Sequence, residues 1–254
     1  MAMMKKFLIL VYCIFIWHSL LAQDSTNMQV TKESKWALNF LFSPDYNYRI
    51  SHKIAEPPIN SSGVGYKTSD QIPKIGWHAS TLLSYKCAKH FFIQTGLILE
   101  NKGYYTKRFL YYISYDKYGQ INYYDYRTYK MNYYLIGIPL LMNGEFELSK
   151  RLYATFALGI NYYNISRSVI KHIGVVSTYE REAFSFSNYL SGNGSIGLNY
   201  YTKQNVILSL KPTFTGFLTS HRDSALGDDA WYHKLYLYSY GVEFGIGFGF
   251  GKKK

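Results

Sequence analysis

The run His221-Arg222-Asp223-Ser224 contains the residue types with which hydrolases activate a nucleophile. A base, an acid and a hydroxyl must converge on one reacting atom, and such groups usually come from separate elements. Adjacent residues in a loop point their side chains in different directions. We therefore expect a polar, solvated loop here, and a hydrolytic site is the alternative.

The other histidines and the cysteines follow no metal-binding pattern. The sequence contains no H-x-x-x-H pair and no C-x-x-C motif, which are the common spacings of zinc ligands. It also lacks a G-x-S-x-G elbow and a phosphate-binding loop. The sequence therefore predicts no catalytic residue, no cofactor and no metal ion.

Four ionisable residues fall on the polar side of segments that otherwise alternate with apolar residues. A charge buried on that side needs a partner. If 219–233 is the loop between two paired strands, Lys211 and Glu243 become diagonal neighbours. We expect ion pairs that plug the interior of a narrow barrel, and a polar conduit is the alternative. The predicted lumen cluster is Glu100, Lys130, Lys211 and Glu243.

The segments that carry these charges have the period of half-buried β-strands. From Tyr236 to Phe250 every second residue is large and apolar, and the residues between are mostly glycine, serine or glutamate. Similar alternation recurs along the chain and predicts about eight strands. The expected connections are 45–73, 86–89, 102–127, 144–150, 165–183, 201–205 and 219–233.

These connections are alternately long and short, which is typical of an up-and-down membrane barrel with short periplasmic turns and long outer loops. The fold class that we predict is all-β, an eight-stranded antiparallel up-and-down transmembrane β-barrel. A soluble exported lipocalin-like barrel is the alternative, in which the bulky face would line a ligand cavity. Glycine and serine on the small face argue against water on that side.

Composition excludes several other classes. The chain has 254 residues, of which 19% are aromatic and 17% charged, so it is too apolar for a disordered protein. Two cysteines cannot staple a chain of this length. Beyond the N-terminus, no apolar run approaches the roughly 20 residues of a spanning helix.

The N-terminus predicts export. Lys5 and Lys6 precede an apolar core from Phe7 to Trp17, and Ala22 offers a small residue for cleavage. An N-terminal membrane anchor is the alternative. We expect a signal peptide at 1–22, a short periplasmic segment at 23–33, the barrel at 34–251 and a basic tail at 252–254.

The expected loop 102–127 is dense in tyrosine. Loops of this length are usually functional or extend their strands, and tyrosine-rich surfaces are good contact surfaces. A hairpin at the membrane rim without a partner is the alternative. The candidate contact residues are Tyr111, Tyr112, Tyr123, Tyr124 and Tyr126.

The net charge of the chain is +12. We expect no nucleic-acid partner, because the barrel is expected to be exported. Basic residues near the rims are suited to the anionic phosphates of outer-membrane lipid and lipopolysaccharide. We place six of them there: Lys102, Lys107, Arg108, Arg127, Arg167 and Lys171.

Three segments resemble the PorT-like outer membrane β-barrel family, which consists of small eight-stranded barrels. They are Phe92 to Gly103 (FIQTGLILENKG), Tyr133 to Leu141 (YYLIGIPLL) and the closing alternation from Tyr240 to Phe250. The resemblance implies a barrel in the outer membrane of a Gram-negative bacterium, inserted by the barrel assembly machinery. Some members are linked to protein secretion and gliding, and no catalytic residue carries over.

The sequence thus predicts a non-catalytic outer-membrane barrel with a structural, adhesion or secretion/assembly role through its long loops. A lipid-modifying enzyme with an active site at the outer rim is the second hypothesis, because such enzymes place serine, histidine and an acid there. The soluble ligand-binding barrel is the third.

Overall fold

The computed structural model describes residues 35–53, 71–115, 117–174, 178–183, 188–202, 204, 206–220 and 233–250. Within these ranges the chain forms one antiparallel sheet of ten strands. The strands are β1 (Trp36–Lys53), β2 (Gln71–Lys86), β3 (Phe91–Thr106), β4 (Phe109–Tyr115), β5 (Ile121–Glu147), β6 (Leu152–Gly174), β7 (Thr178–Ala183), β8 (Asn188–Tyr201), β9 (Val206–Phe217) and β10 (His233–Phe250). The expected signal peptide, the segment 23–33 and the tail 252–254 lie outside the described residues.

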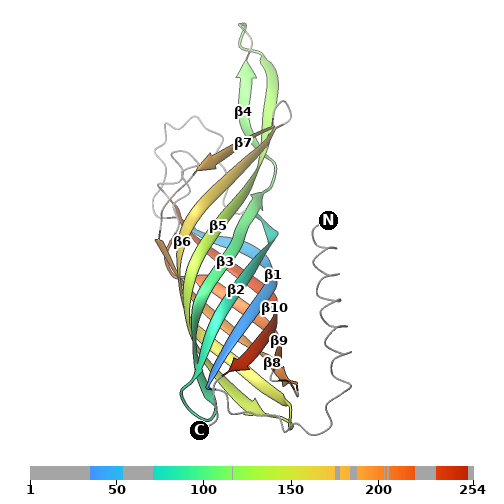
Figure 1. The fold of residues 1–254 in the computed structure, drawn as a ribbon. Helices are drawn as coiled ribbons and strands as arrows, with labels where there is room; N and C mark the ends of the chain where they lie inside the picture. The colour runs from blue at the N-terminus through green and yellow to red at the C-terminus, as the bar shows by residue number, and fades with distance from the viewer. Residues whose placement is uncertain are drawn as a thin grey trace.

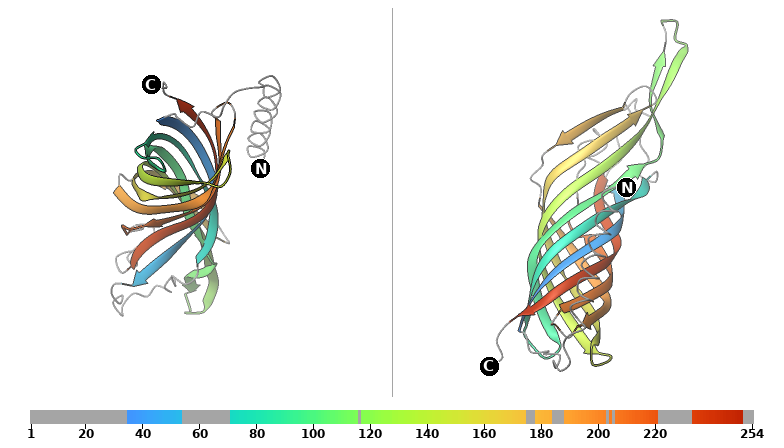
Figure 2. Two further views of the ribbon diagram at one scale, coloured as in Figure 1. Left: turned by 90° about the horizontal axis from the view of Figure 1, so that it is seen from below. Right: turned by 45° about the vertical axis from the view of Figure 1, so that its right-hand side comes forward.

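Eight of these strands close into a barrel. The ring runs β1-β2-β3-β5-β6-β8-β9-β10 and closes because β1 pairs with β10 (Figures 1 and 2). The other two strands, β4 and β7, pair with the parts of β5 and β6 that continue above the ring. The predicted eight-stranded antiparallel up-and-down barrel is confirmed, and its closure leaves no unpaired edge within the ring.

The short connections share one end of the barrel. Residues 87–90, 148–151 and 202–205 join successive strands there, at the end where Trp36 pairs with Phe250. The alternation of short and long connections is therefore as predicted. The strands run further than expected, because much of the predicted loop 102–127 is strand that belongs to β3, β4 and β5.

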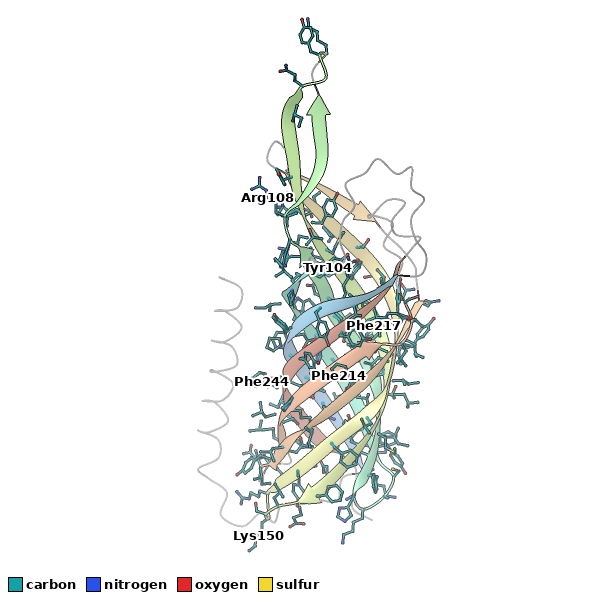
Figure 3. All side chains as sticks on the ribbon, turned by 180° about the vertical axis from the view of Figure 1, so that it is seen from behind. Tyr104, Arg108, Lys150, Phe214, Phe217 and Phe244 are labelled. Atoms are coloured by element: carbon teal, nitrogen blue, oxygen red, sulfur yellow. The ribbon has the colours of Figure 1, made fainter. Side chains whose placement is uncertain are left out.

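The outer face of the ring is apolar. On β10 the outward side chains Tyr240, Val242, Phe244, Phe248 and Phe250 are exposed, and glycines face inward. Figure 3 shows Phe214 and Phe244 on this outer surface. Among the described residues, no helix is long and apolar enough to cross a membrane.

Aromatic side chains gather at both limits of this apolar face. The interval from Trp36 to Tyr46 matches the roughly 9–11 residues that a tilted strand needs to cross the hydrocarbon core. The inner aromatic ring contains Trp36, Tyr85, Phe91, Tyr200 and Phe250, and the outer aromatic ring contains Tyr46, Trp77, Tyr162 and Tyr240. Aromatic residues at two such levels are typical of membrane interfaces.

Candidate functional site

The lumen holds charged side chains, and one contact joins two neighbouring strands. Lys211 on β9 lies directly opposite Glu243 on β10, with its Nζ 3.8 Å from the Glu243 Oε1. The two residues that we expected to be neighbours are therefore in contact. They are direct partners rather than diagonal ones, because the centre of the β9–β10 connection lies slightly further along the chain than expected.

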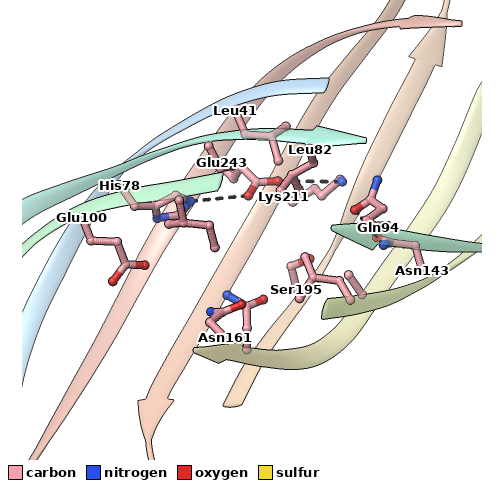
Figure 4. Close-up of a pocket in the computed structure, with 15 residues that line it drawn as sticks. Leu41, His78, Leu82, Gln94, Glu100, Asn143, Asn161, Ser195, Lys211 and Glu243 are labelled. Carbon is pink, nitrogen blue, oxygen red and sulfur yellow. Dashed lines mark hydrogen bonds and ion pairs between the residues drawn. The ribbon is translucent and has the colours of Figure 1, made fainter. Parts of the chain in front are cut away.

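His78 on β2 joins this pair to a second carboxylate. Its Nε2 is 3.5 Å from the Glu243 Oε2, and its Nδ1 is 3.0 Å from the Asp45 Oδ2. The Ser43 hydroxyl donates a hydrogen bond of 2.7 Å to Asp45. Figure 4 shows the link between His78 and Glu243 and the link between Glu243 and Lys211. These side chains are almost enclosed, so they have one another rather than bulk water as partners.

Lys102 extends the cluster to Glu100. The Lys102 Nζ is 3.2 Å from the Glu100 Oε2 and 3.8 Å from the Asp45 Oδ2. It also donates a hydrogen bond of 2.6 Å to the Ser239 hydroxyl. Three carboxylates thus lie beside two ammonium groups and one imidazole, which is the pairing that buried charges need. The observed lumen cluster consists of Asp45, His78, Glu100, Lys102, Lys211 and Glu243.

Tyr163 ties this cluster to β6. Its hydroxyl donates a hydrogen bond of 2.7 Å to the Glu100 Oε1 and accepts one of 2.9 Å from the Asn161 amide. The Tyr163 side chain is fully buried and stacks on Phe217, with 5.6 Å between the ring centroids. One aromatic side chain therefore links the charges to the apolar packing above them.

Neutral polar side chains fill the lumen toward the short connections. Ser84 accepts hydrogen bonds of 2.6 Å from Asn39 and from Gln94, and Asn143 donates one of 2.7 Å to Gln94. These four residues come from β1, β2, β3 and β5, so the chain of bonds crosses half of the ring. These buried polar groups therefore satisfy one another's hydrogen-bonding needs.

Aromatic side chains fill the opposite end. Tyr104, Tyr129, Tyr133, Tyr163 and Phe217 belong to one buried apolar cluster. The Arg49 guanidinium lies 3.7 Å from the centre of the Tyr104 ring and donates a hydrogen bond to the Tyr104 hydroxyl. Figure 3 shows Tyr104 and Phe217 at this end.

The open space between these two fillings is small. A cavity of about 20 Å³ lies beside Glu100, Asn161, Lys211 and Glu243 (Figure 4). A water molecule needs roughly 10–15 Å³ of such space, so this cavity is of the size that one water occupies. Asn161 Oδ1 is buried without a hydrogen-bond partner and is suited to accept from a water there.

Three of the four predicted lumen residues lie in the lumen, and the fourth prediction is wrong. Glu100, Lys211 and Glu243 line the cavity. Lys130 faces away from the lumen, because Tyr129 and Met131 on either side of it are the buried residues of β5. Its Nζ instead lies 5.4 Å from the centre of the Tyr105 ring on β3.

The reason for this error is general. Alternation shows which residues share a face of a strand, but not which of the two faces points outward. The face with the large apolar side chains was expected to point toward lipid. On the upper part of β5 the large side chains Tyr129, Met131, Tyr133 and Leu135 face inward and pack in the mouth. The expectation that Lys102 lies near a rim is also wrong. It was placed in a loop, whereas β3 continues through this position and its side chain is buried in the lumen cluster.

Sequence reasoning did not assign Asp45, His78 or Lys102 to the cluster. Asp45 follows Pro44 and was placed in a loop, whereas β1 continues through it. His78 did fall on the small polar face of its strand with Ser80 and Ser84, and that phase was the available signal. Lys102 reaches Asp45 across β2, so no adjacent-strand argument brings them together.

A two-stranded ribbon extends above the barrel. β4 pairs with the first part of β5, so that Tyr112 lies opposite Asp125, and Tyr124 lies opposite Ile113 (Figure 1). The side chains of Tyr111, Tyr112, Tyr123 and Tyr124 lie outside the described part of the structure. Tyr126 is described, and the Arg108 guanidinium lies 4.7 Å from the centre of its ring. At the tip, Tyr118 is 76% exposed.

The candidate hydrolytic run 221–224 lies outside the described residues. Asp45 and His78 form an acid–histidine pair, and both side chains are buried in the lumen. No group of three His, Cys, Asp or Glu side chains that could hold a metal ion occurs among the described residues.

Comparison with solved structures returns chains of low sequence identity to this one. Neisserial surface protein A is 10% identical with a TM-score of 0.44, and 85% of this chain aligns with 98% of that one. Ail of Yersinia pestis in complex with the heparin analogue sucrose octasulfate is 8% identical over 84% and 99% of the two chains, with a TM-score of 0.28. The N-terminal β-barrel domain of Pseudomonas aeruginosa OprF is 12% identical over 84% and 98%, with a TM-score of 0.29.

No protein-family model and no curated protein matches the chain. The assignment of the fold therefore rests on the strand pairing itself, and the resemblance to PorT-like barrels stays a prediction.

Proposed function

We propose that the chain is an integral outer-membrane β-barrel of a Gram-negative bacterium with a non-catalytic role. The observation that carries this proposal is the apolar outer face between the inner and outer aromatic rings, around a lumen filled by polar side chains. Water would be a poor solvent for such a surface, whereas lipid is a good one. The expected signal peptide would deliver the chain to the barrel assembly machinery.

The same arrangement argues against the soluble alternative. A lipocalin-like barrel would direct its bulky residues into a ligand cavity. In this barrel Phe244 and Phe248 face outward, and the opposite face of β10 carries glycines and Glu243. Polar side chains from several strands fill the lumen, and the cavity between them, among the described residues, is far smaller than a site for a ligand of ordinary size.

The filled lumen also favours an anchor over a pore. Eight strands leave room for little more than side chains, and here the lumen cluster and the aromatic mouth occupy that room. We therefore propose that the barrel holds the β4–β5 ribbon above the membrane, where it contacts a protein partner. Adhesion and a secretion or assembly role are both consistent with such a ribbon, and the resemblance to PorT-like barrels favours the second.

Fractionation and gel mobility test the location. We expect the protein in the outer-membrane fraction, with faster migration in SDS before boiling than after it. Soluble protein without a mobility shift would contradict an outer-membrane barrel.

Ribbon variants test the role. A chain that lacks 109–126 should keep the mobility shift and lose any protein that cross-links to the intact chain on cells. The matched variant changes Tyr111, Tyr112, Tyr123 and Tyr124 to serine and keeps the ribbon length. Equal cross-linking by all three chains would contradict a contact through the ribbon.

A further inference from the structure

The outer face of β5 changes character above the outer aromatic ring. Its outward residues are Ile138 and Ile136 within the apolar belt, then Tyr134, and then Asn132 and Lys130. On the neighbouring β6, Tyr162 is followed by Asn164 and, after a bulge, by Arg167 and Lys171. The hydrocarbon boundary on these two strands therefore lies near Ile136 and Tyr162.

Two lysines on this upper face are direct neighbours. Lys130 on β5 pairs with Lys171 on β6, and both side chains are partly exposed. Like charges directly opposite each other in a sheet are destabilising. Tyr105 flanks the pair on β3, and an exposed acid, Glu180 on β7, flanks it on the other side. Among the side chains that the structure describes, one carboxylate lies opposite two ammonium groups, which leaves a positive surface that an additional anion would stabilise. Glu182 pairs with Val169 further along β7, and its side chain lies outside the described part of the structure.

A third cation lies lower on the same face. The Arg167 guanidinium is 5.7 Å from the centre of the Tyr134 ring, with which it is paired across the strands. The buried Val169 separates Arg167 from Lys171 along β6. Arg167, Lys130 and Lys171 together form a positive stripe along β5 and β6 above the expected membrane boundary.

The height of the positive stripe above the hydrocarbon boundary indicates which kind of lipid can reach it. Lys130 is six residues above Ile136, which is about 15 Å for a strand that rises about 3.3 Å per residue at a tilt of about 40°. The polar layer of a phospholipid leaflet is only about 5–7 Å thick. An anion that reaches Lys130 must therefore belong to a larger headgroup, such as a phosphorylated oligosaccharide.

We propose that the outward face of β5 and β6 above the outer aromatic ring binds the phosphorylated oligosaccharide headgroup of an outer-leaflet glycolipid, with Lys130 and Lys171 as its anion-binding residues. Asn132 and Thr128 lie in the same outward phase and supply hydrogen-bonding groups for sugar hydroxyls. This inference rests on the proposed location in the outer membrane.

The test uses the full chain refolded in a neutral detergent. Binding is measured for phosphorylated lipopolysaccharide, for the same glycolipid after dephosphorylation, and for phosphatidylglycerol. The double variant Lys130→Gln/Lys171→Gln should bind the phosphorylated glycolipid about thirtyfold more weakly than the natural chain, since each of the two lysines contributes about 1 kcal/mol near such a surface and about 1.4 kcal/mol is a factor of ten. Lys130→Arg/Lys171→Arg should retain binding.

The matched control is Lys117→Gln, which removes an exposed lysine at the tip of the ribbon and should not change binding. Equal binding by the glutamine double variant, or equal binding of phosphatidylglycerol and lipopolysaccharide by the natural chain, would overturn the inference. The SDS mobility shift is recorded for every chain. Loss of the mobility shift in the natural chain would contradict the barrel itself. An intact shift with equal binding of phosphatidylglycerol and lipopolysaccharide would contradict only the glycolipid site.

Discussion

Lys211 and Glu243 face each other across the β9–β10 pair inside the barrel, with 3.8 Å between the ammonium nitrogen and a carboxylate oxygen. His78 lies on the other oxygen of Glu243 and carries the contact on to Asp45. The strands β1, β2, β9 and β10 are thus joined through their side chains as well as through their backbones.

Lys211→Met removes one side of this pair and leaves Glu243 with an unbalanced buried charge. We expect the free energy of unfolding in denaturant to fall by about 3–5 kcal/mol. The double variant Lys211→Met/Glu243→Gln should recover much of this loss, because it also removes the charge. If the single variant were as stable as the natural chain, the pair would be solvated rather than buried.

Tyr163→Phe tests the link between the charges and the aromatic mouth. The variant deletes the hydroxyl that donates to Glu100 and accepts from Asn161, so we expect a loss of about 1–3 kcal/mol in unfolding free energy. The adjacent Tyr162→Phe is the control, since Tyr162 is 50% exposed on the outer face. Similar losses in both variants would show that the Tyr163 hydroxyl has no special role.

Gly241→Ala tests the close packing of the lumen. A Cβ at this position would overlap the carboxylate of Asp45 and the hydroxyl of Ser43, so we expect a loss of about 1–3 kcal/mol from overpacking. Gly192→Ala is the matched control, because a Cβ there would meet nothing within 4 Å. The measurement is urea unfolding in micelles, and an unchanged Gly241→Ala midpoint would contradict the observed packing.

Much of this architecture could be predicted from the sequence, because most strands of the ring alternate with a period of two. On β10 the alternation indicated which residues face outward, and it placed Glu243 inward. The alternation along β9 likewise placed Lys211 on the inward face. The prediction was weaker on the upper part of β5, since Tyr129 and Met131 pack inward there and Lys130 points outward.

The full lumen cluster depends on information that a single strand does not carry. Lys102 and Asp45 come from β3 and β1, which are separated by β2. Their contact across the lumen requires the curvature of the closed barrel. Alternation predicts that such side chains point inward, but it does not predict which of them meet.

The most direct test of the membrane-spanning barrel is to compare how much folding free energy a lysine costs at two depths on its outer face. Phe244 lies between the two aromatic rings, whereas Phe250 lies in the inner aromatic ring. In lipid bilayers we expect Phe244→Lys to cost about 2–4 kcal/mol of folding free energy and Phe250→Lys about 0–1 kcal/mol. Two variants with the natural stability, as expected for a face exposed to water, would contradict the account.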